Sequence, residues 1–251
     1  MANERQQRAE RAEQMRKERE KAGRRQRNLI SIAIVVVVIG LIALGAWAVK
    51  NAMDPGPAPT LVAPKNTTDD FGIVYDEAPA GSDPVSVELY EDFQCPICVI
   101  FEHQSSGVLA EMVESGEITI TYRPFSFLDE FGGSPNRYSH RATNVALCAL
   151  DQGGVADYVK VHDYLFTNQP EERTKGPADA ELIKAVAGLG ITGIDSCVES
   201  ERFMPWVDEA MKAGEKRGVE GTPTVFVDGQ QLENPMDVTS LPQAIKAAQK
   251  G

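Results

Sequence analysis

Cysteine and basic residues are both scarce in this chain. Its 251 residues include four cysteines, too few for the disulfide framework that holds a small secreted scaffold together. Residues 67–251 carry 13 Lys or Arg against 31 Asp or Glu, a net charge of −18. Because an acidic surface repels phosphates, we expect no binding to nucleic acid. The hydrophobic fraction of 42% and the charged fraction of 25% are ordinary for a globular protein, which excludes wholesale disorder.

Charge is absent from the 21 residues between Leu29 and Val49. At about 1.5 Å per residue, a helix of this length spans roughly 31 Å, the thickness of the hydrocarbon layer of a membrane. Trp47 lies near one end, where an aromatic ring suits the interface. The alternative is a cleaved signal peptide, but the apolar region of such a peptide is about 7–15 residues long. We therefore predict one uncleaved transmembrane helix, a signal-anchor, over residues 29–49.

Positive charge is concentrated at one end of this segment. Arg24, Arg25 and Arg27 precede it, whereas Lys50 alone follows it closely. Since the more basic flank stays in the cytoplasm, we expect a cytoplasmic N-terminus in the cell membrane and an extracytoplasmic remainder. The predicted parts are a basic cytoplasmic N-terminus over 1–28, the anchor over 29–49, a Pro-rich linker over 50–66 and one domain over 67–251.

The pattern within residues 67–251 predicts an α/β fold. Apolar and polar residues alternate over 85–90 and 118–122, as in half-buried strands. A third strand at 224–227 precedes an Asp-Gly hairpin turn. One helix is expected after the first of these strands, at about 96–115, and another near the C-terminus, at 238–250. Between the second and third strands lies a helical insert at about 135–218, interrupted by Gly and Pro.

Cys95-Pro96-Ile97-Cys98 carries the candidate chemistry, because it follows a strand and opens a helix. At a helix start, Cys95 lies beside unpaired N–H groups and the positive end of the helix dipole. Both stabilise a thiolate, and the thiol pKa in motifs of this kind falls to about 3.5–7.5. Pro96 suits the first helical turn. We expect Cys95 to be the exposed nucleophile and Cys98, one turn later, to be the shielded resolving thiol.

Two other uses of this pair are a structural disulfide and a zinc site. A structural bridge between cysteines this close in sequence is uncommon. Zinc needs about four ligands, and the other candidates form no second close pair: His103, His140, His162, Cys148 and Cys197. His103 comes five residues after Cys98, which is off the same helical face. We therefore expect a redox-active pair and no metal.

A second motif, Gly221-Thr222-Pro223-Thr224, comes immediately before the third strand. Proline at the start of a strand is confined to edges and special sites. An X-Pro bond at this position can be cis, which turns the backbone and leaves the polar groups of Thr222 free. The alternative is an ordinary turn.

These motifs carry a family resemblance. The segment Tyr90–Cys98, the helical insert and Thr222-Pro223 resemble the DsbA family of thioredoxin-fold thiol oxidases, and the anchored acidic form resembles its actinobacterial members. The resemblance covers roughly residues 70–250. It implies a thioredoxin fold with a helical insertion domain and no bound cofactor. It also implies a cis Pro223 near the cysteine pair and a Thr222 backbone that pairs with an extended substrate. The motif residues that flank the cysteines are Phe93, Pro96 and Ile97.

Two positions depart from the family pattern. Many thioredoxin-like proteins have a buried acid six residues before the first cysteine, where this chain has Leu89, and Glu88 and Glu91 do not match that position. The dipeptide between the cysteines is Pro-Ile, whereas the best-known oxidase has Pro-His. Neither the proton-handling role of that acid nor a particular reduction potential therefore follows from the resemblance.

Cys148 and Cys197 remain. Family members commonly carry a further disulfide in the helical block. If Cys95 pairs with Cys98, these two are left for each other, 49 residues apart. Such a bridge would persist outside the cytoplasm and stabilise the fold by up to about 4 kcal/mol. The alternative is two buried free thiols. We expect a structural disulfide with no direct part in catalysis.

The expected function is thiol–disulfide exchange that forms disulfides in exported proteins through Cys95 and Cys98. The resemblance implies two partners: unfolded exported proteins that contain cysteine, and a quinone-linked membrane reoxidase of the DsbB-like or VKOR-like type. Two alternatives stay open. One is a reductase or isomerase of the same fold, for example in cytochrome maturation. The other is a redox-inert module that binds unfolded chains.

Overall fold

The computed structural model describes residues 37–47 and 61–250. The chain divides into two compact units, residues 1–58 and 59–251. In the first unit, residues 37–47 form a helix with exposed side chains. The rest of the predicted anchor, residues 29–36 and 48–49, lies outside the described residues, as does most of the predicted linker. Among the helices that are described, none combines the length and apolar character needed to cross a bilayer.

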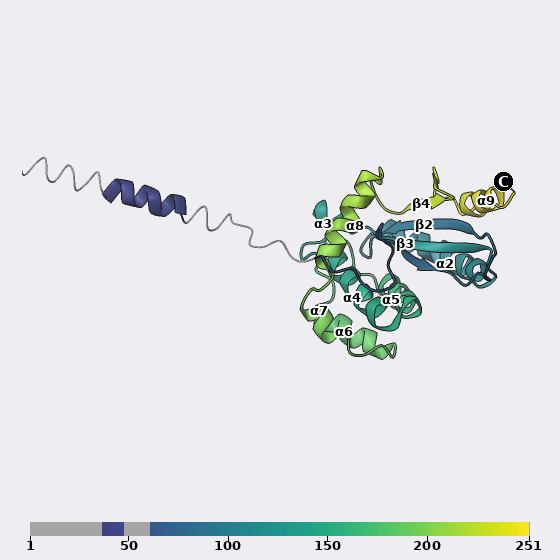
Figure 1. Cartoon of the computed structure of the whole chain (residues 1–251), viewed down its shortest axis with the longest axis horizontal. Helices are drawn as coiled ribbons and strands as arrows, with labels where there is room; N and C mark the ends of the chain where they lie inside the picture. The colour runs from purple at the N-terminus through teal and green to yellow at the C-terminus, as the bar shows by residue number, and fades with distance from the viewer. Residues whose placement is uncertain (1–36, 48–60, 251) are drawn as a thin grey trace, which may run out of the picture. The chain divides into compact units, whose positions relative to one another are not determined.

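The second unit is built on a mixed five-stranded sheet with β2 at its centre (Figure 1). β2 pairs in parallel with β3 and antiparallel with β4, while β1 and β5 form the antiparallel edges. A parallel pair needs a crossover connection, and α2 (Pro96–Glu114) supplies it between β2 and β3. The strands are β1 (Ile73–Tyr75), β2 (Val85–Glu91), β3 (Ile118–Pro124), β4 (Thr224–Val227) and β5 (Gln230–Gln231).

Helices separate β3 from β4 and form the insert. Gly and Pro end them where the sequence predicts: α4 stops at Gly153, and the break before α6 contains Pro170 and Gly176. The predicted α/β order with a helical insert is therefore confirmed. The insert helices are α3 (Phe127–Glu130), α4 (Tyr138–Gly153), α5 (Val155–Thr167), α6 (Asp179–Gly188), α7 (Asp195–Glu199) and α8 (Met204–Lys216), and α9 (Ser240–Ala248) follows β5.

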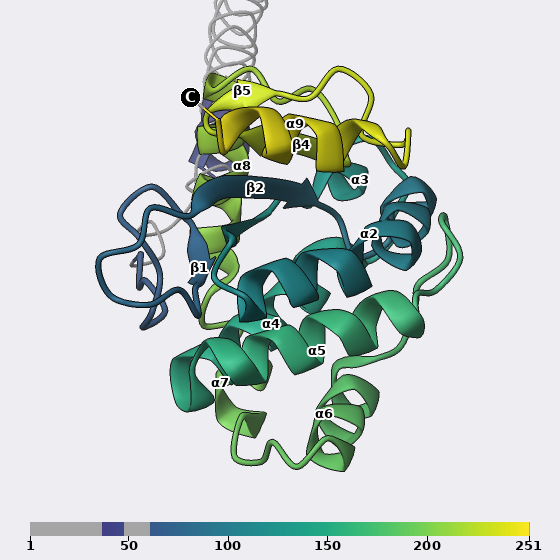
Figure 2. The same cartoon turned by 90° about the vertical axis from the view of Figure 1, so that its right-hand side faces the viewer.

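The two faces of β2 belong to different layers. Successive strand residues point to opposite faces of a sheet. Val87 and Leu89 enter the main hydrophobic core, to which α2, α5 and α9 contribute, and Figure 2 shows α5 running beside α2. Tyr90 points the other way and packs with Phe125 and Met211. Glu91 has the same parity as Leu89, so its side chain faces the layer that contains α2 and α5.

Candidate active site

The two candidate cysteines lie where β2 ends and α2 begins. Cys95 is the N-cap residue of α2, and Pro96 occupies the first helical turn. The carbonyl oxygen of Cys95 accepts hydrogen bonds from the backbone N–H groups of Cys98, at 3.0 Å, and Val99, at 3.3 Å. Both cysteines are free thiols in this structure. This placement puts one sulfur at the helix start and the other one turn inside.

The environment of Cys95 favours its thiolate. The pKa of Cys95 is lowered to about 6, mainly because the thiol of Cys98 donates a hydrogen bond to its sulfur. Burial opposes this effect, while the Thr222 side chain and the backbone N–H groups of Cys98 and Ile97 reinforce it. A thiol with this pKa is mostly ionised at neutral pH, so Cys95 can act as a nucleophile and as a leaving group.

Cys98 has the opposite character. It is 0% exposed, and burial, followed by its interactions with Cys95, raises its pKa well above the usual value. Cys95 is itself only 6% exposed, so the prediction that its side chain is exposed to solvent is wrong. The reason is tertiary: the Thr222 segment lies against the sulfur, and Gln169 Nε2 donates a 3.0 Å hydrogen bond to the Cys95 carbonyl.

The Thr222-Pro223 motif meets the cysteine pair. The peptide bond between these residues is cis. The Cys95 thiol lies 3.6 Å from the Thr222 carbonyl oxygen. The Thr222 hydroxyl is buried and has no hydrogen-bond partner among the described residues, so it is available to donate to a thiolate at Cys95. The ordinary-turn alternative, remote from the cysteines, does not fit this placement.

The flanking motif residues divide between core and surface. Phe93 is buried and packs its ring against the rings of His162 and Phe166. Pro96 and Ile97 are exposed beside Cys95. The approach to the sulfur is therefore apolar on this side.

Asp92 links the cysteine motif to the helical insert through hydrogen bonds. The sequence did not predict this role. Its carboxylate accepts hydrogen bonds from the backbone N–H groups of Gln94 and Leu128 and from the Ser139 hydroxyl, at 2.6–2.8 Å. Burial raises its pKa to about 7, and these three hydrogen bonds oppose the rise. The partners of Asp92 are up to 47 residues away in the chain, so no local sequence pattern indicates them.

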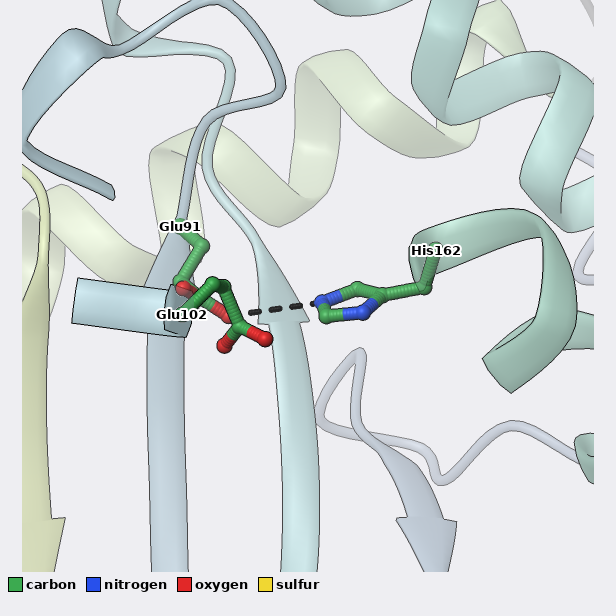
Figure 3. Close-up of side chains that lie close together, drawn as sticks. All are labelled: Glu91, Glu102 and His162. Atoms are coloured by element: carbon green, nitrogen blue, oxygen red, sulfur yellow. Dashed lines mark hydrogen bonds and ion pairs between the residues drawn. The ribbon is translucent and has the colours of Figure 1, made fainter. Parts of the chain in front are cut away.

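A second cluster missed from the sequence comprises Glu91, Glu102 and His162 (Figure 3). Their oxygen and nitrogen atoms lie within 4.8 Å of one another, a grouping that could in principle hold a metal ion. Of the zinc ligands considered from the sequence, His162 belongs to this cluster, whereas Cys148 and Cys197 are joined to each other and His140 pairs with Asp129. The sequence spacing did indicate a place for Glu102 near Cys98. Glu102 comes four residues after Cys98, so the two side chains share one buried face of the helix.

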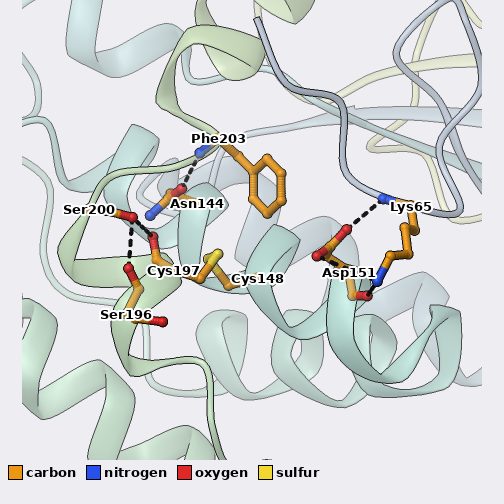
Figure 4. Close-up of a disulfide and its surroundings, with 8 residues drawn as sticks. All are labelled: Lys65, Asn144, Cys148, Asp151, Ser196, Cys197, Ser200 and Phe203. Carbon is orange, nitrogen blue, oxygen red and sulfur yellow. Dashed lines mark hydrogen bonds and ion pairs between the residues drawn. A yellow bond between two sulfur atoms is a disulfide. The ribbon is translucent and has the colours of Figure 1, made fainter. Parts of the chain in front are cut away.

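The structure joins Cys148 of α4 to Cys197 of α7 in a disulfide, with Cα atoms 5.9 Å apart (Figure 4). One turn earlier on α4, Asn144 Oδ1 accepts a 2.9 Å hydrogen bond from the Phe203 N–H, just before α8. The bridge and this hydrogen bond tie three insert helices together. The pair belongs to the insert, whereas the free thiols belong to the start of α2.

Comparisons with known proteins agree with this geometry. A family model described as thioredoxin matches residues 80–247. The fold is similar to MdbA, a thiol-disulfide oxidoreductase from Corynebacterium diphtheriae, with 24% identity and a TM-score of 0.62 over 78% of this chain and 98% of that one. It is also similar to reduced DsbA from Mycobacterium tuberculosis, with 25% identity and a TM-score of 0.56 over 71% of this chain and 99% of that one.

Two curated proteins also match part of this chain. Disulfide bond formation protein D of Bacillus subtilis is 22% identical over 173 residues, which cover 67% of this chain and 74% of that protein. The Na(+)/H(+) antiporter NhaA 3 of Salinispora tropica is 26% identical over 166 residues. That match covers 66% of this chain but only 23% of the antiporter.

Proposed function

Since this chain belongs to the thioredoxin family, we propose that it forms disulfides in exported proteins through Cys95 and Cys98. It is a DsbA-like protein thiol–disulfide oxidoreductase. The observation that carries the proposed direction is the asymmetry of the pair. Cys95 has a pKa of about 6 at the helix start, and Cys98 is fully buried with a raised pKa.

The proposed reaction starts with the Cys95–Cys98 disulfide. A substrate thiolate attacks Sγ of Cys95, a new S–S bond forms, and the old bond breaks with its electron pair on Cys98, which takes up a proton. A second substrate thiolate then attacks the substrate sulfur of the mixed disulfide, and Cys95 leaves as a thiolate. The substrate loses two electrons and two protons. The enzyme gains the two electrons and ends as one thiolate and one thiol.

The thiolate of Cys95 supports the oxidising direction. Stabilising the reduced form makes a dithiol–disulfide pair a stronger oxidant. Cys95 is also the leaving group of the second step, and a thiol of lower pKa leaves faster. In a reductase the disulfide form is stabilised relative to the reduced form. The stable thiolate of Cys95 therefore favours disulfide formation over the reductase alternative.

The substrate site we propose lies along Thr222. An extended peptide can pair with its backbone in strand fashion, which would bring a substrate sulfur to Cys95. The substrates are unfolded exported proteins that contain cysteine. The reduced pair is reoxidised by exchange with a disulfide of a quinone-linked membrane reoxidase, of the DsbB-like or VKOR-like type.

The location is part of the proposal. We propose that residues 29–49 anchor the chain in the cell membrane, with residues 1–28 in the cytoplasm and the catalytic domain outside. The uncharged segment and its one-sided Arg flank support this orientation. The Cys148–Cys197 disulfide supports an oxidising compartment. Protease added to spheroplasts should degrade the domain, and protection of the domain there would contradict the orientation.

The function is tested with the oxidised full-length chain in detergent and a peptide that contains two cysteines. Wild type should convert the peptide to its disulfide and Cys95→Ser should not. Reduced Cys98→Ala, given the oxidised peptide instead, should accumulate a mixed disulfide through Cys95, because no second thiol of the pair is left to resolve it. The reduction potential should lie nearer about −120 mV, as in strong oxidases, than about −270 mV, as in thioredoxin. A potential near the lower value would favour a reductase, and peptide binding without thiol exchange would identify a redox-inert module.

A further inference from the structure

An irregular loop of the helical insert lies against the cysteine motif. This α5–α6 loop comprises residues 168–178. Figure 2 shows it reaching from the end of α5 toward the start of α2 before the chain enters α6. Gln169 Nε2 donates a 3.0 Å hydrogen bond to the Cys95 carbonyl oxygen. Like the Thr222 segment, the loop therefore meets Cys95 from a distant part of the chain.

A second glutamine binds the loop from the motif. Gln94 directly precedes Cys95 and is 0% exposed. Its Nε2 donates hydrogen bonds to the carbonyl oxygens of Glu171, at 3.0 Å, and Thr174, at 2.9 Å. The motif thus holds the loop through Gln94, and the loop holds the motif through Gln169. These three hydrogen bonds form a glutamine latch.

Two features of the loop oppose its closed position. Gln94 Oε1 is buried without a hydrogen-bond partner among the described residues, and leaving a buried acceptor unpaired is unfavourable. Arg173 has a φ of +67°, a left-handed conformation that residues other than glycine rarely adopt. Its N–H donates a 2.6 Å hydrogen bond to the Gly133 carbonyl oxygen. Release of the loop would let water reach Gln94 Oε1 and relax the backbone at Arg173.

The part of the loop nearest α6 is held separately. Arg141 of α4 donates hydrogen bonds to the carbonyl oxygens of Lys175, at 3.2 Å, and Pro177, at 3.0 Å. Gly176 lies between them with a φ of +61°, a region that glycine enters freely. Backbone rotation at Gly176 can therefore move residues 169–174 while Arg141 keeps the end of the loop in place.

The chemistry requires that the cover of Cys95 moves. A thiolate that attacks Sγ must approach in line with the bond that breaks, yet Cys95 is only 6% exposed. The Thr222 segment leads directly into β4, which pairs with the central strand β2, so the sheet holds it in place. Residues 168–178 are all exposed or half-buried and belong to no helix or strand. The loop is thus the covering segment that can be displaced without unfolding the sheet.

We propose that residues 169–174 form a gate over Cys95, held closed by the glutamine latch, and that a cysteine-containing chain reaches the sulfur by displacing it. The inference rests on the proposed function, because it concerns access to the same cysteine. A small thiol needs little opening, whereas a polypeptide reacts only with the open fraction of molecules. Gln94 and Gln169 therefore determine how strongly the site discriminates by the size of the attacking molecule.

The test compares a small and a large reagent of the same chemistry. The reduced full-length chain in detergent is labelled with N-ethylmaleimide or with a maleimide that carries a long polyethylene glycol chain, and peptide mass analysis confirms the label at Cys95. Methionine keeps the length of glutamine but removes its donors. We expect Gln94→Met and Gln169→Met to speed labelling by the large maleimide roughly 2- to 10-fold for each hydrogen bond lost, and to change labelling by N-ethylmaleimide less than about two-fold.

Gln104→Met is the matched control, because Gln104 is an exposed glutamine of α2. It should change neither rate. Equal acceleration with both maleimides, or none with the large one, in folded Gln94→Met and Gln169→Met would overturn the gate. Failure of wild type to oxidise a peptide would instead contradict the proposed function, because labelling needs no thiol exchange.

Amide hydrogen exchange provides a second test if the glutamine variants fail to fold. The mixed disulfide between a peptide and Cys95 is prepared with Cys98→Ala and the oxidised peptide. Its Arg173 N–H should exchange several-fold faster than in the free reduced variant, because displacing the gate breaks the hydrogen bond to Gly133. The N–H of Leu147, inside α4, should exchange at the same rate in both. An unchanged rate at Arg173 would overturn the proposal.

Discussion

The sulfur of Cys95 lies 3.6 Å from the carbonyl oxygen of Thr222, although 127 residues separate them in the chain. The contact joins the two candidate motifs into one site. The nucleophile comes from a helix start, and the segment that faces it comes from the approach to β4. A peptide bound along Thr222 would therefore deliver its sulfur to the one cysteine whose thiolate is stable.

We expect Thr222→Val to raise the pKa of Cys95. The Thr222 side chain is one of the groups that hold this pKa near 6, after the larger effect of Cys98. Valine keeps the shape but removes the hydroxyl, so the pKa should rise by about one unit. The ultraviolet absorbance of the thiolate, followed against pH, measures it. Thr222→Ser is the control and should keep the wild-type value. An unchanged pKa in the valine variant would exclude the hydroxyl as a thiolate donor.

The stability of the reduced protein should rise with pH between about 6 and 9. In the folded state the pKa of Cys95 is lowered from 9.0 to about 6. Above pH 6 the folded form is a thiolate while the unfolded form still binds the proton, so raising the pH favours folding. This contribution is full above the unfolded pKa, at roughly 3–4 kcal/mol, and is lost as the pH falls through 6.

The oxidised protein is the matched reference for this measurement, because its cysteines do not titrate. Denaturant unfolding of both redox forms isolates the effect below about pH 8, since above it the unfolded Cys98 also ionises while the buried Cys98 keeps its proton, which opposes the rise. Parallel stability curves for the two forms would show that Cys95 has an ordinary thiol pKa.

Local sequence pattern predicted the strand, the cysteine pair and the helix that follows, because each rests on neighbouring residues. The insert was predicted for the same reason. Glu91 and His162 could not be brought together from the sequence, since 71 residues separate them and no periodicity links them. The limited exposure of Cys95 was missed because Gln169 and Thr222 cover it from distant segments.

The helical spacing of α2 contained further information about Glu102. The buried residues of α2 include Cys98, Phe101, Glu102 and Leu109, which recur at helical spacing on one face. A glutamate within that apolar stripe needs a buried partner or a proton. The spacing therefore contains a signal for an unusual acid near Cys98, although its partners on β2 and α5 become visible only in the fold.

Removing the Cys148–Cys197 bridge should lower stability but not thiol exchange. The bridge closes a loop of 49 residues in the insert, and its loss should cost about 2–4 kcal/mol of unfolding free energy. The double variant Cys148→Ala, Cys197→Ala should oxidise a peptide at nearly the wild-type rate below its melting temperature. Denaturant unfolding and peptide oxidation measure the two properties separately. A large loss of rate in the folded double variant would assign the bridge a part in catalysis.

The last prediction concerns Glu88, on the face of β2 opposite the cluster of Glu91, Glu102 and His162. Its carboxylate accepts hydrogen bonds at 2.5 Å from Arg123 and from both terminal nitrogens of Arg217. These arginines outweigh burial and hold the pKa of Glu88 below its usual value. Glu88→Gln would leave the largely buried Arg123 facing Arg217 without a compensating charge between them. Breaking a buried pair in this way should cost about 3–5 kcal/mol.

Lys212→Ala is the matched control for this change. Lys212 pairs with Glu209 at 2.7 Å, but the two side chains are 66% and 44% exposed, so their separation should cost less than about 1 kcal/mol. Denaturant unfolding of both variants gives the comparison. The rate at which Cys95 attacks a small disulfide should stay near the wild-type value in each folded variant, because Glu88 points away from the layer that contains the cysteine pair. Similar small losses of stability in the two variants would mean that water screens the Glu88 cluster as it does an exposed pair. A slowed Cys95 in folded Glu88→Gln would show that the two faces of β2 are coupled.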